Sequence, residues 1–185
     1  MKYGKDNFVE NSTLHNSVKL GHFNQISNST IDADCSINAS VIEDSVVGCG
    51  VEIGPFAHIR PNSNIGDGCR IGNYVEIKNS TLGKNTKVAH LAYVGDAVIG
   101  DNCNIGCGVI FANYNGKEKN KIVVGNNVFI GSNSNLVAPV TIGDNVYICA
   151  GSTVTKDINS GEFVIARSRE TIKPNRAKEY LKRMY

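Results

Sequence analysis

An aliphatic residue recurs every six positions through most of this chain. One such run is Val47, Ile53, Ile59, Ile65, Ile71 and Ile77, and another is Val124, Ile130, Leu136, Ile142, Ile148 and Val154. Glycine often follows the aliphatic residue, and the position four residues after it holds a small or β-branched residue in many hexads. The sequence shows neither the 3.6-residue spacing of an amphipathic helix nor the strand alternation of a β-sandwich.

A six-residue period predicts a triangular coil in which each hexad forms one short strand and one corner. Three hexads close one coil, and successive coils stack about 4.8 Å apart through parallel strand pairing. The aliphatic residue and the residue four positions later are expected to point inward, among them the compact side chains of Cys35, Cys69 and Cys103. Resemblance to hexapeptide-repeat proteins adds the handedness, so the expected fold is an all-β, left-handed parallel β-helix.

Breaks in the period divide the chain. Steps of five residues occur at Ile77–Leu82 and Val94–Ile99, and a step of thirteen separates Phe111 from Val124. The polar stretch within that long step contains an Asn-Gly turn signal, which predicts an extruded loop near 112–123. We expect an N-terminal segment of unclear role at 1–17, the β-helix at 18–166 with looser coils before residue 47, and a basic tail at 167–185. A short helix is expected over 175–184, after Pro174.

Charge and cysteine content indicate which partners and which cellular compartment to expect. The 185 residues carry a net charge of +2, with seven Lys/Arg and two Asp/Glu from Arg167 onward, so a basic tail follows a mildly acidic body. This balance does not argue for nucleic acid or membrane binding. The start of the chain lacks a signal-peptide pattern and no long apolar run is present, so we expect a cytoplasmic protein. The six cysteines are then expected to be buried, reduced thiols.

Three side chains stand out for chemistry. Arg60 and Lys78 lie eighteen residues apart, so the coil stacks them on one face, where a shared anion such as phosphate would relieve their repulsion. The alternative is two solvated surface cations. His90 lies on a neighbouring face and has the chemistry of a general base, although a histidine on a β-helix face is more often structural or solvated than catalytic. The remaining histidines are not closely paired and no Cys-x-x-Cys occurs, so no metal site is expected.

Several ordered motifs resemble one family, the C-terminal acetyltransferase domain of the bifunctional bacterial enzyme that makes UDP-N-acetylglucosamine. The similarity covers residues 18–168 and rests on the segments Gly54–Pro61, Gly72–Lys78, His90–Asp96, Asn102–Gly106, Asn113–Gly116 and Val137–Val140. The resemblance implies a homotrimer with active sites between subunits, which transfers acetyl from acetyl-CoA to the amine of glucosamine-1-phosphate.

The resemblance also implies individual roles. His90 matches the general base, and the residues that match the sugar-phosphate contacts are Arg60, Lys78, Tyr93, Asn104 and Lys119. The residues that match acetyl-CoA contacts are Cys107, Asn113, Tyr114, Ser132, Ala150 and Arg167. Two departures are Cys107, where the family usually has Ala, and Asn115, where it has Asp. The family's uridyltransferase domain is missing, which predicts a monofunctional enzyme and leaves room for a separate uridyltransferase.

Other functions stay open at this point. The acceptor could be another amino-sugar phosphate, a sugar nucleotide or a sugar hydroxyl. In that case the coenzyme residues and His90 would stay, but Arg60 and Lys78, which we call the phosphate clamp, could change. A non-catalytic trimeric scaffold would be expected to lose both His90 and the clamp. A relative of the gamma-class carbonic anhydrases, which share the fold, is disfavoured by the histidine spacing.

Overall fold

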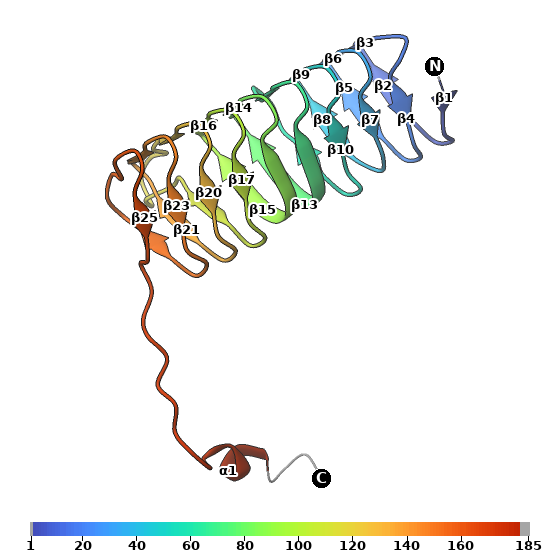
Figure 1. Ribbon diagram of the computed structural model, residues 1–185. Helices are drawn as coiled ribbons and strands as arrows, with labels where there is room; N and C mark the ends of the chain where they lie inside the picture. Colours follow the sequence, from blue (N-terminus) through green and yellow to red (C-terminus); the bar gives the residue numbers. More distant parts are fainter. Residues whose placement is uncertain (1, 182–185) are drawn as a thin grey trace.

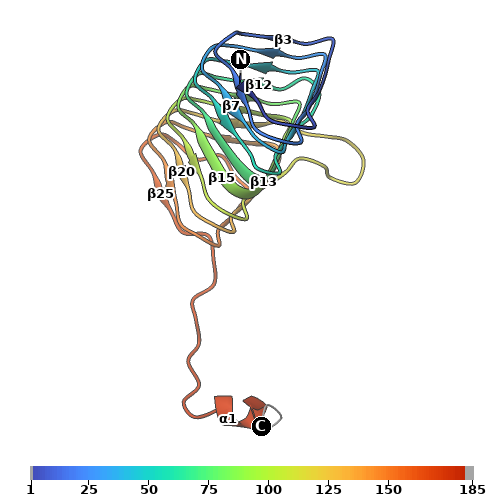
Figure 2. The ribbon, with the colours of Figure 1, turned by 90° about the vertical axis from the view of Figure 1, so that its right-hand side faces the viewer.

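The computed structural model describes residues 2–181, which form twenty-five short strands and one five-residue helix. The strands stack in parallel into the predicted β-helix, with the N-terminal coil at one end of the stack and the C-terminal coil at the other (Figures 1 and 2). Every pairing between the named strands is parallel, and each strand pairs with the coil before it, the coil after it, or both.

The strands fall into three stacks, one for each face of the triangular coil. Face one holds β1 (Lys2–Tyr3), β4 (Lys19–Leu20), β7 (Ser36–Ile37), β10 (Glu52–Ile53), β17 (Asn104–Ile105), β20 (Phe129–Ile130), β23 (Tyr147–Ile148) and β25 (Phe163–Val164). Face two holds β2 (Phe8–Glu10), β5 (Gln25–Ser27), β8 (Val41–Glu43), β11 (His58–Ile59), β18 (Ile110–Ala112), β21 (Asn135–Val137) and β24 (Thr153–Val154). Face three holds β3 (Thr13–Leu14), β6 (Thr30–Ile31), β9 (Val46–Val47), β12 (Asn64–Ile65), β14 (Thr81–Leu82), β16 (Ala97–Ile99), β19 (Ile122–Val124) and β22 (Val140–Ile142).

Two longer strands, β13 (Arg70–Lys78) and β15 (Lys87–Gly95), run from face one across the first corner onto face two. Their pairing continues through that corner, where Asn73 lies beside His90. We call the turn between faces one and two the first corner. The second corner joins faces two and three, and the third corner joins faces three and one.

The predicted inward positions form the core. The aliphatic residues of the hexads are buried, and so are the residues that follow four positions later, such as Ala57, Ser63 and Val75. A long column of buried side chains, contributed by all three faces of each coil, therefore fills the coil axis. Because burial of apolar surface is the main favourable term in folding, this column holds the coils together.

The coils vary in length, and this variation sets the register. Paired residues are sixteen or seventeen positions apart in the first coils, for example Lys2 with Lys19 and Gln25 with Val41. The spacing rises to eighteen for His58 with Glu76. The looser pattern before residue 47 thus forms continuous parallel pairing, and segment 1–17 contributes β1, β2 and β3 to the first coil.

The predicted loop leaves the second corner between β18 and β19 and projects from the stack (Figure 2). It raises the spacing between paired residues to twenty-five, as for Val98 with Val123. The loop folds back on itself through an antiparallel bridge between Tyr114 and Lys119, and the Asn120 amide donates to the Asn113 carbonyl at 2.7 Å. After β25 the chain leaves the stack as an extended segment and ends in α1 (Ala177–Leu181), within the helix predicted over 175–184, whose last residues lie outside the described range.

The cysteine prediction needs a correction. All six cysteines are unpaired, and Cys35, Cys69 and Cys103 point inward as expected. Burial raises the pKa of the Cys69 thiol to about 11. Cys49 and Cys107 are exposed and Cys149 is half-buried, so the expectation of buried thiols is wrong for these three. They lie at corners, where side chains point away from the axis. Within residues 2–181, no helix has the length and apolar character needed to cross a membrane.

Candidate active site

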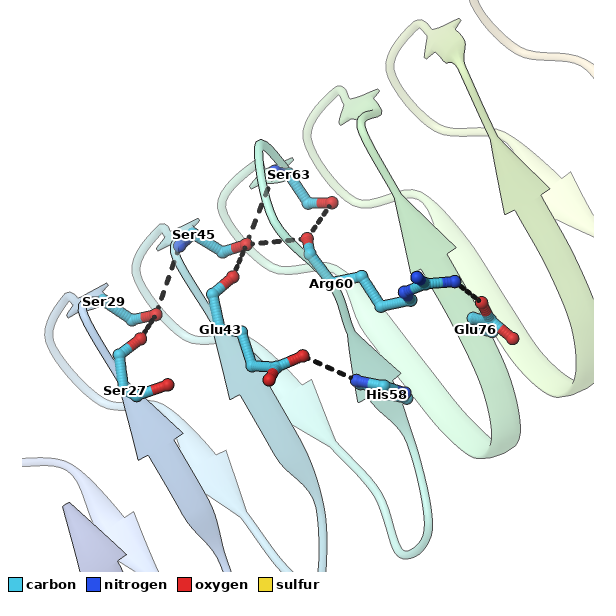
Figure 3. A network of polar contacts seen from close by, with 8 residues as sticks. All are labelled: Ser27, Ser29, Glu43, Ser45, His58, Arg60, Ser63 and Glu76. Atoms are coloured by element: carbon cyan, nitrogen blue, oxygen red, sulfur yellow. Dashed lines mark hydrogen bonds and ion pairs between the residues drawn. The ribbon is translucent and has the colours of Figure 1, made fainter. Parts of the chain in front are cut away.

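The second corner holds the two predicted clamp residues in place through a ladder of buried serines. Ser63 Oγ donates to the Arg60 carbonyl at 2.7 Å, and Ser80 Oγ donates to the Lys78 carbonyl at 2.8 Å (Figure 3 shows the first of these). The Arg60 amide donates to the carbonyl of Ile77, the residue before Lys78, at 2.8 Å. Arg60 and Lys78 are therefore stacked one coil apart at this corner, as their spacing predicts.

Arg60 has a carboxylate partner that the sequence reasoning did not assign. Its Nη1 lies 2.8 Å from Glu76 Oε1, one coil further along face two (Figure 3). This hydrogen bond raises the pKa of the Arg60 guanidinium. A second pair, Glu43 Oε2 with His58 Nε2 at 2.9 Å, repeats the same diagonal one coil earlier. Glu76 thus fixes the direction of the Arg60 guanidinium, and part of the Arg60 side chain remains exposed to solvent.

The Lys119 side chain, on the extruded loop, lies near the Lys78 side chain. The nearby Lys78 ammonium lowers the pKa of Lys119, and the Asp96 carboxylate opposes this shift. Two ammonium groups held together favour an anion between or above them. The loop therefore adds a third cation to the pair predicted from the coil spacing.

Tyr93 lies next to this cluster. It is paired in register with Glu76 on the neighbouring strand, and its hydroxyl accepts a hydrogen bond from Asn113 Nδ2 at 3.3 Å. Asn113 is 6% exposed, and its amide also donates to Asp96 Oδ2. Asp96 thereby connects the clamp to the start of the loop. From the sequence it was known only as the last residue of the segment His90–Asp96.

His90 stands at the first corner, exposed to solvent. Its Nδ1 lies 3.2 Å from Asn73 Oδ1 on the neighbouring coil. This contact suits the tautomer in which Nδ1 donates to the Asn73 amide oxygen, and in that tautomer Nε2 is the basic nitrogen. Asn73 was not identified from the sequence, because its partner lies seventeen positions away and the pair depends on the length of that coil.

Four of the predicted coenzyme residues continue along the first corner. Hydrogen bonds link it from coil to coil: Gly108 N to Leu91 O, Asn133 N to Cys107 O, and Gly151 N to Ser132 O. This order places Cys107, Ser132 and Ala150 successively beyond His90, and the Arg167 side chain reaches the next position, beside Gly151. The result is an exposed track about four coils long that begins at His90.

A hollow on face two lies between His90's corner and the clamp. It is lined by Tyr74, Glu76, Leu91, Tyr93, Gly108 and Ile110. Both Tyr74 and Leu91 have positive φ, so their side chains project outward from the corner. The lining of this hollow is mostly apolar, and Glu76 and Tyr93 lie on its clamp side.

The single chain does not bring every predicted residue together. Asn104 is on face one, in the outward column between Lys87 and Phe129, and not with Arg60 and Lys78. Tyr114 is exposed on the loop, where its hydroxyl donates to the Gly116 carbonyl at 2.8 Å. Across residues 2–181, no group of three or more His, Cys, Asp or Glu side chains is arranged to hold a metal ion.

Two family models match the chain: the GMPPB C-terminal domain over residues 41–115 and the bacterial transferase hexapeptide (six repeats) over residues 121–156. The bifunctional protein GlmU of Caldicellulosiruptor saccharolyticus is 56% identical over 148 residues, which are 80% of this chain and 32% of that protein. The bifunctional protein GlmU of Clostridium acetobutylicum is 53% identical over 149 residues, 80% of this chain and 33% of that protein. The chain thus spans about a third of the length of these relatives.

Solved structures agree on the fold. A UDP-N-acetylglucosamine acyltransferase has a TM-score of 0.79 at 19% identity and covers 100% of this chain and 77% of its own. The GDP-perosamine N-acetyltransferase of Caulobacter crescentus, solved with CoA and GDP-perosamine, has a TM-score of 0.57 at 24% identity, over 63% of this chain and 53% of its own. At these identities the likeness establishes the β-helix architecture.

Proposed function

We propose that this chain, which belongs to the hexapeptide-repeat acyltransferases, transfers an acetyl group from acetyl-CoA to the amine of glucosamine-1-phosphate. One observation carries the acceptor: Arg60 and Lys78 are stacked one coil apart at the second corner, with Tyr93 beside them, and such a cluster suits a phosphate. The lowered pKa of Lys119 places a further cation near Lys78. The identity to the GlmU proteins supports the same reaction.

The chemistry falls to His90. The sugar amine must lose a proton as it attacks the thioester carbonyl, and His90 Nε2 accepts that proton while Asn73 holds the ring by Nδ1. The clamp fixes the phosphate end of the sugar, and the hollow lined by Tyr74 and Tyr93 lies between the clamp and His90. Orientation of this kind contributes several kcal/mol to catalysis.

The track along the first corner suits acetyl-CoA. A coenzyme whose thioester lies at His90 would run past Cys107, Ser132 and Ala150 towards Arg167, whose guanidinium is suited to the coenzyme phosphates. The exposed Cys107 thiol would then lie close to the reacting thioester. We place this reaction in the cytoplasm, where the six unpaired cysteines stay reduced.

The position of Asn104 supports an active site shared between copies of the chain in a homotrimer. Asn104 lies on face one and the clamp lies on face two, so a second copy packed with its face one against this face two would bring the two together. Mixing an Asn104→Ala chain with a His90→Ala chain should restore activity in the mixed assembly. If the mixture is no more active than its parts, the shared site is wrong.

Thiol release from acetyl-CoA tests the function. Purified protein should release the thiol with glucosamine-1-phosphate and far more slowly with glucosamine, glucosamine-6-phosphate or UDP-glucosamine. A preference for another of these acceptors would keep the acetyl transfer but overturn the acceptor. No release with any acceptor, from a folded protein that binds acetyl-CoA, would contradict the proposed reaction.

A further inference from the structure

Asp96 occupies a special place at the second corner, because it connects three parts of the site. Its backbone amide donates to the Lys78 carbonyl at 3.1 Å, and its own carbonyl accepts from the amide of Ile122, where the loop returns, at 3.2 Å. Its carboxylate accepts hydrogen bonds from Asn79 Nδ2 on one oxygen and from Asn113 Nδ2, at the start of the loop, on the other. Asp96 therefore ties both ends of the loop that carries Lys119 to the clamp.

The carboxylate also decides which way the Asn113 amide faces. A carboxylate can only accept hydrogen bonds, so Asn113 must present its NH2 group to Asp96. The same NH2 group then has its second hydrogen directed at the Tyr93 hydroxyl, 3.3 Å away. The Tyr93 oxygen is the acceptor in this bond, which leaves the hydroxyl hydrogen of Tyr93 free for another partner.

The backbone makes room for this arrangement. A Cβ atom on Gly95 would lie 2.3 Å from Tyr93 Oη and 2.6 Å from Asn113 Nδ2. The absence of a side chain at position 95 lets the phenol and the amide meet directly over the strand. The orientation of Tyr93 is thus supported by two independent features, the hydrogen-bond chain and the space above Gly95.

We propose that Asp96 is a positioning residue that acts through Asn113 to aim the Tyr93 hydroxyl proton at the acceptor phosphate. This inference rests on the proposed function and assigns Asn113 to the tyrosine, not to the coenzyme. Replacing Asp96 by asparagine removes the constraint, because an amide at 96 can also donate. Asn113 can then turn its oxygen toward Tyr93, and the tyrosine proton turns inward, away from the phosphate.

The test compares Asp96→Asn, Tyr93→Phe and the double variant in the thiol-release assay. Each single variant should raise the KM for glucosamine-1-phosphate about tenfold or more, the effect of one hydrogen bond to a charged group. The KM for acetyl-CoA should stay unchanged. The double variant should be no worse than Tyr93→Phe alone, because both changes remove the same bond.

The matched control is Asp101→Asn, at the third corner. Asp101 Oδ1 accepts a hydrogen bond from the backbone amide of Lys84. One coil later, Asn126 Oδ1 accepts the equivalent bond from the backbone amide of Asp101, so an asparagine side chain can make this contact. This control should keep wild-type kinetics. If Asp96→Asn fails to fold, Asn113→Ala replaces it, with the same rise in acceptor KM and the same lack of additivity with Tyr93→Phe.

Three results would overturn the inference in an active enzyme: an acceptor KM unchanged by Asp96→Asn, multiplicative effects in the double variant, or a KM for acetyl-CoA raised by Asn113→Ala. In each of them the wild type still acetylates glucosamine-1-phosphate, so the proposed function stands. A wild-type protein with no activity toward that acceptor would instead contradict the proposed function and the inference together.

Discussion

Replacing Gly95 by alanine should misplace Tyr93 without unfolding the coil. The new Cβ would lie 2.3 Å from Tyr93 Oη, where ordinary contact begins at 3.4 Å, so the phenol must move by about 1 Å. Both crowded atoms belong to side chains and the Gly95 backbone has no positive φ, so the strand itself can stay in place. Loss of a hydrogen bond from Tyr93 to the phosphate would weaken acceptor binding by about 1.5–3 kcal/mol.

The assay is acceptor-dependent thiol release from acetyl-CoA, with thermal unfolding measured in parallel. Gly95→Ala should raise the acceptor KM about ten- to a hundredfold and leave the KM for acetyl-CoA unchanged. Gly48→Ala is the matched control, because its Cβ would crowd Asp67 Oδ1 at 2.5 Å at the third corner. That control should lower the unfolding temperature without changing the acceptor KM. An acceptor KM unchanged by Gly95→Ala would refute the role given to Tyr93.

Three further outcomes follow from the same geometry. His90→Ala should lower kcat by about two to four orders of magnitude while coenzyme binding persists, and near-normal turnover would refute the general-base role. Burial raises the pKa of Cys69 from 9.0 to about 11, so the folded state holds this proton more tightly than the unfolded chain. The free energy of unfolding should therefore fall as pH rises from 9 to 11, and a flat profile in denaturant titrations would contradict the burial. In thiol labelling, Cys49 and Cys107 should react quickly, and acetyl-CoA should protect Cys107 only; equal protection of both would remove Cys107 from the coenzyme track.

The core was predictable from the sequence because each hexad assigns its own inward positions. An aliphatic residue and the residue four positions later point to the axis whatever the neighbouring coils do, so Ile59 and Ser63 could be placed without knowing the register. The number of residues in each coil is harder to predict than the inward positions. Sixteen, seventeen, eighteen and twenty-five residues all close a coil in this chain. Three full hexads give eighteen, and a five-residue or thirteen-residue step in place of one hexad gives seventeen or twenty-five, but the sixteen-residue coil from Gln25 to Val41 lies where the period is loose.

The same distinction explains which site residues were found. Arg60 and Lys78 were identified because their coil has the standard eighteen residues. Asn73 with His90, and Asp96 with Asn113, are separated by seventeen, so they meet only because five-residue steps shorten those coils. Lys119 approaches Lys78 through a loop whose fold has no period at all. Contacts across coils of irregular length need the three-dimensional register, and motif resemblance can name the residues without showing what holds them.

The register also explains why one chain leaves the site open. Arg60, Lys78 and Tyr93 lie on or beside face two, His90 lies at its edge, and Asn104 lies around the corner on face one. A β-helix is rigid, because each coil is bonded to the coils on both sides, so no bending of the chain could carry Asn104 onto face two. If Asn104 contacts the acceptor, it must come from another copy. The exposed apolar corner residues Phe56, Tyr74 and Leu91 border this same face, and a second copy packed there would cover them. Assembly and completion of the acceptor site would then be one event, so a variant that separates the copies should lose acceptor binding while each chain keeps its own clamp cations.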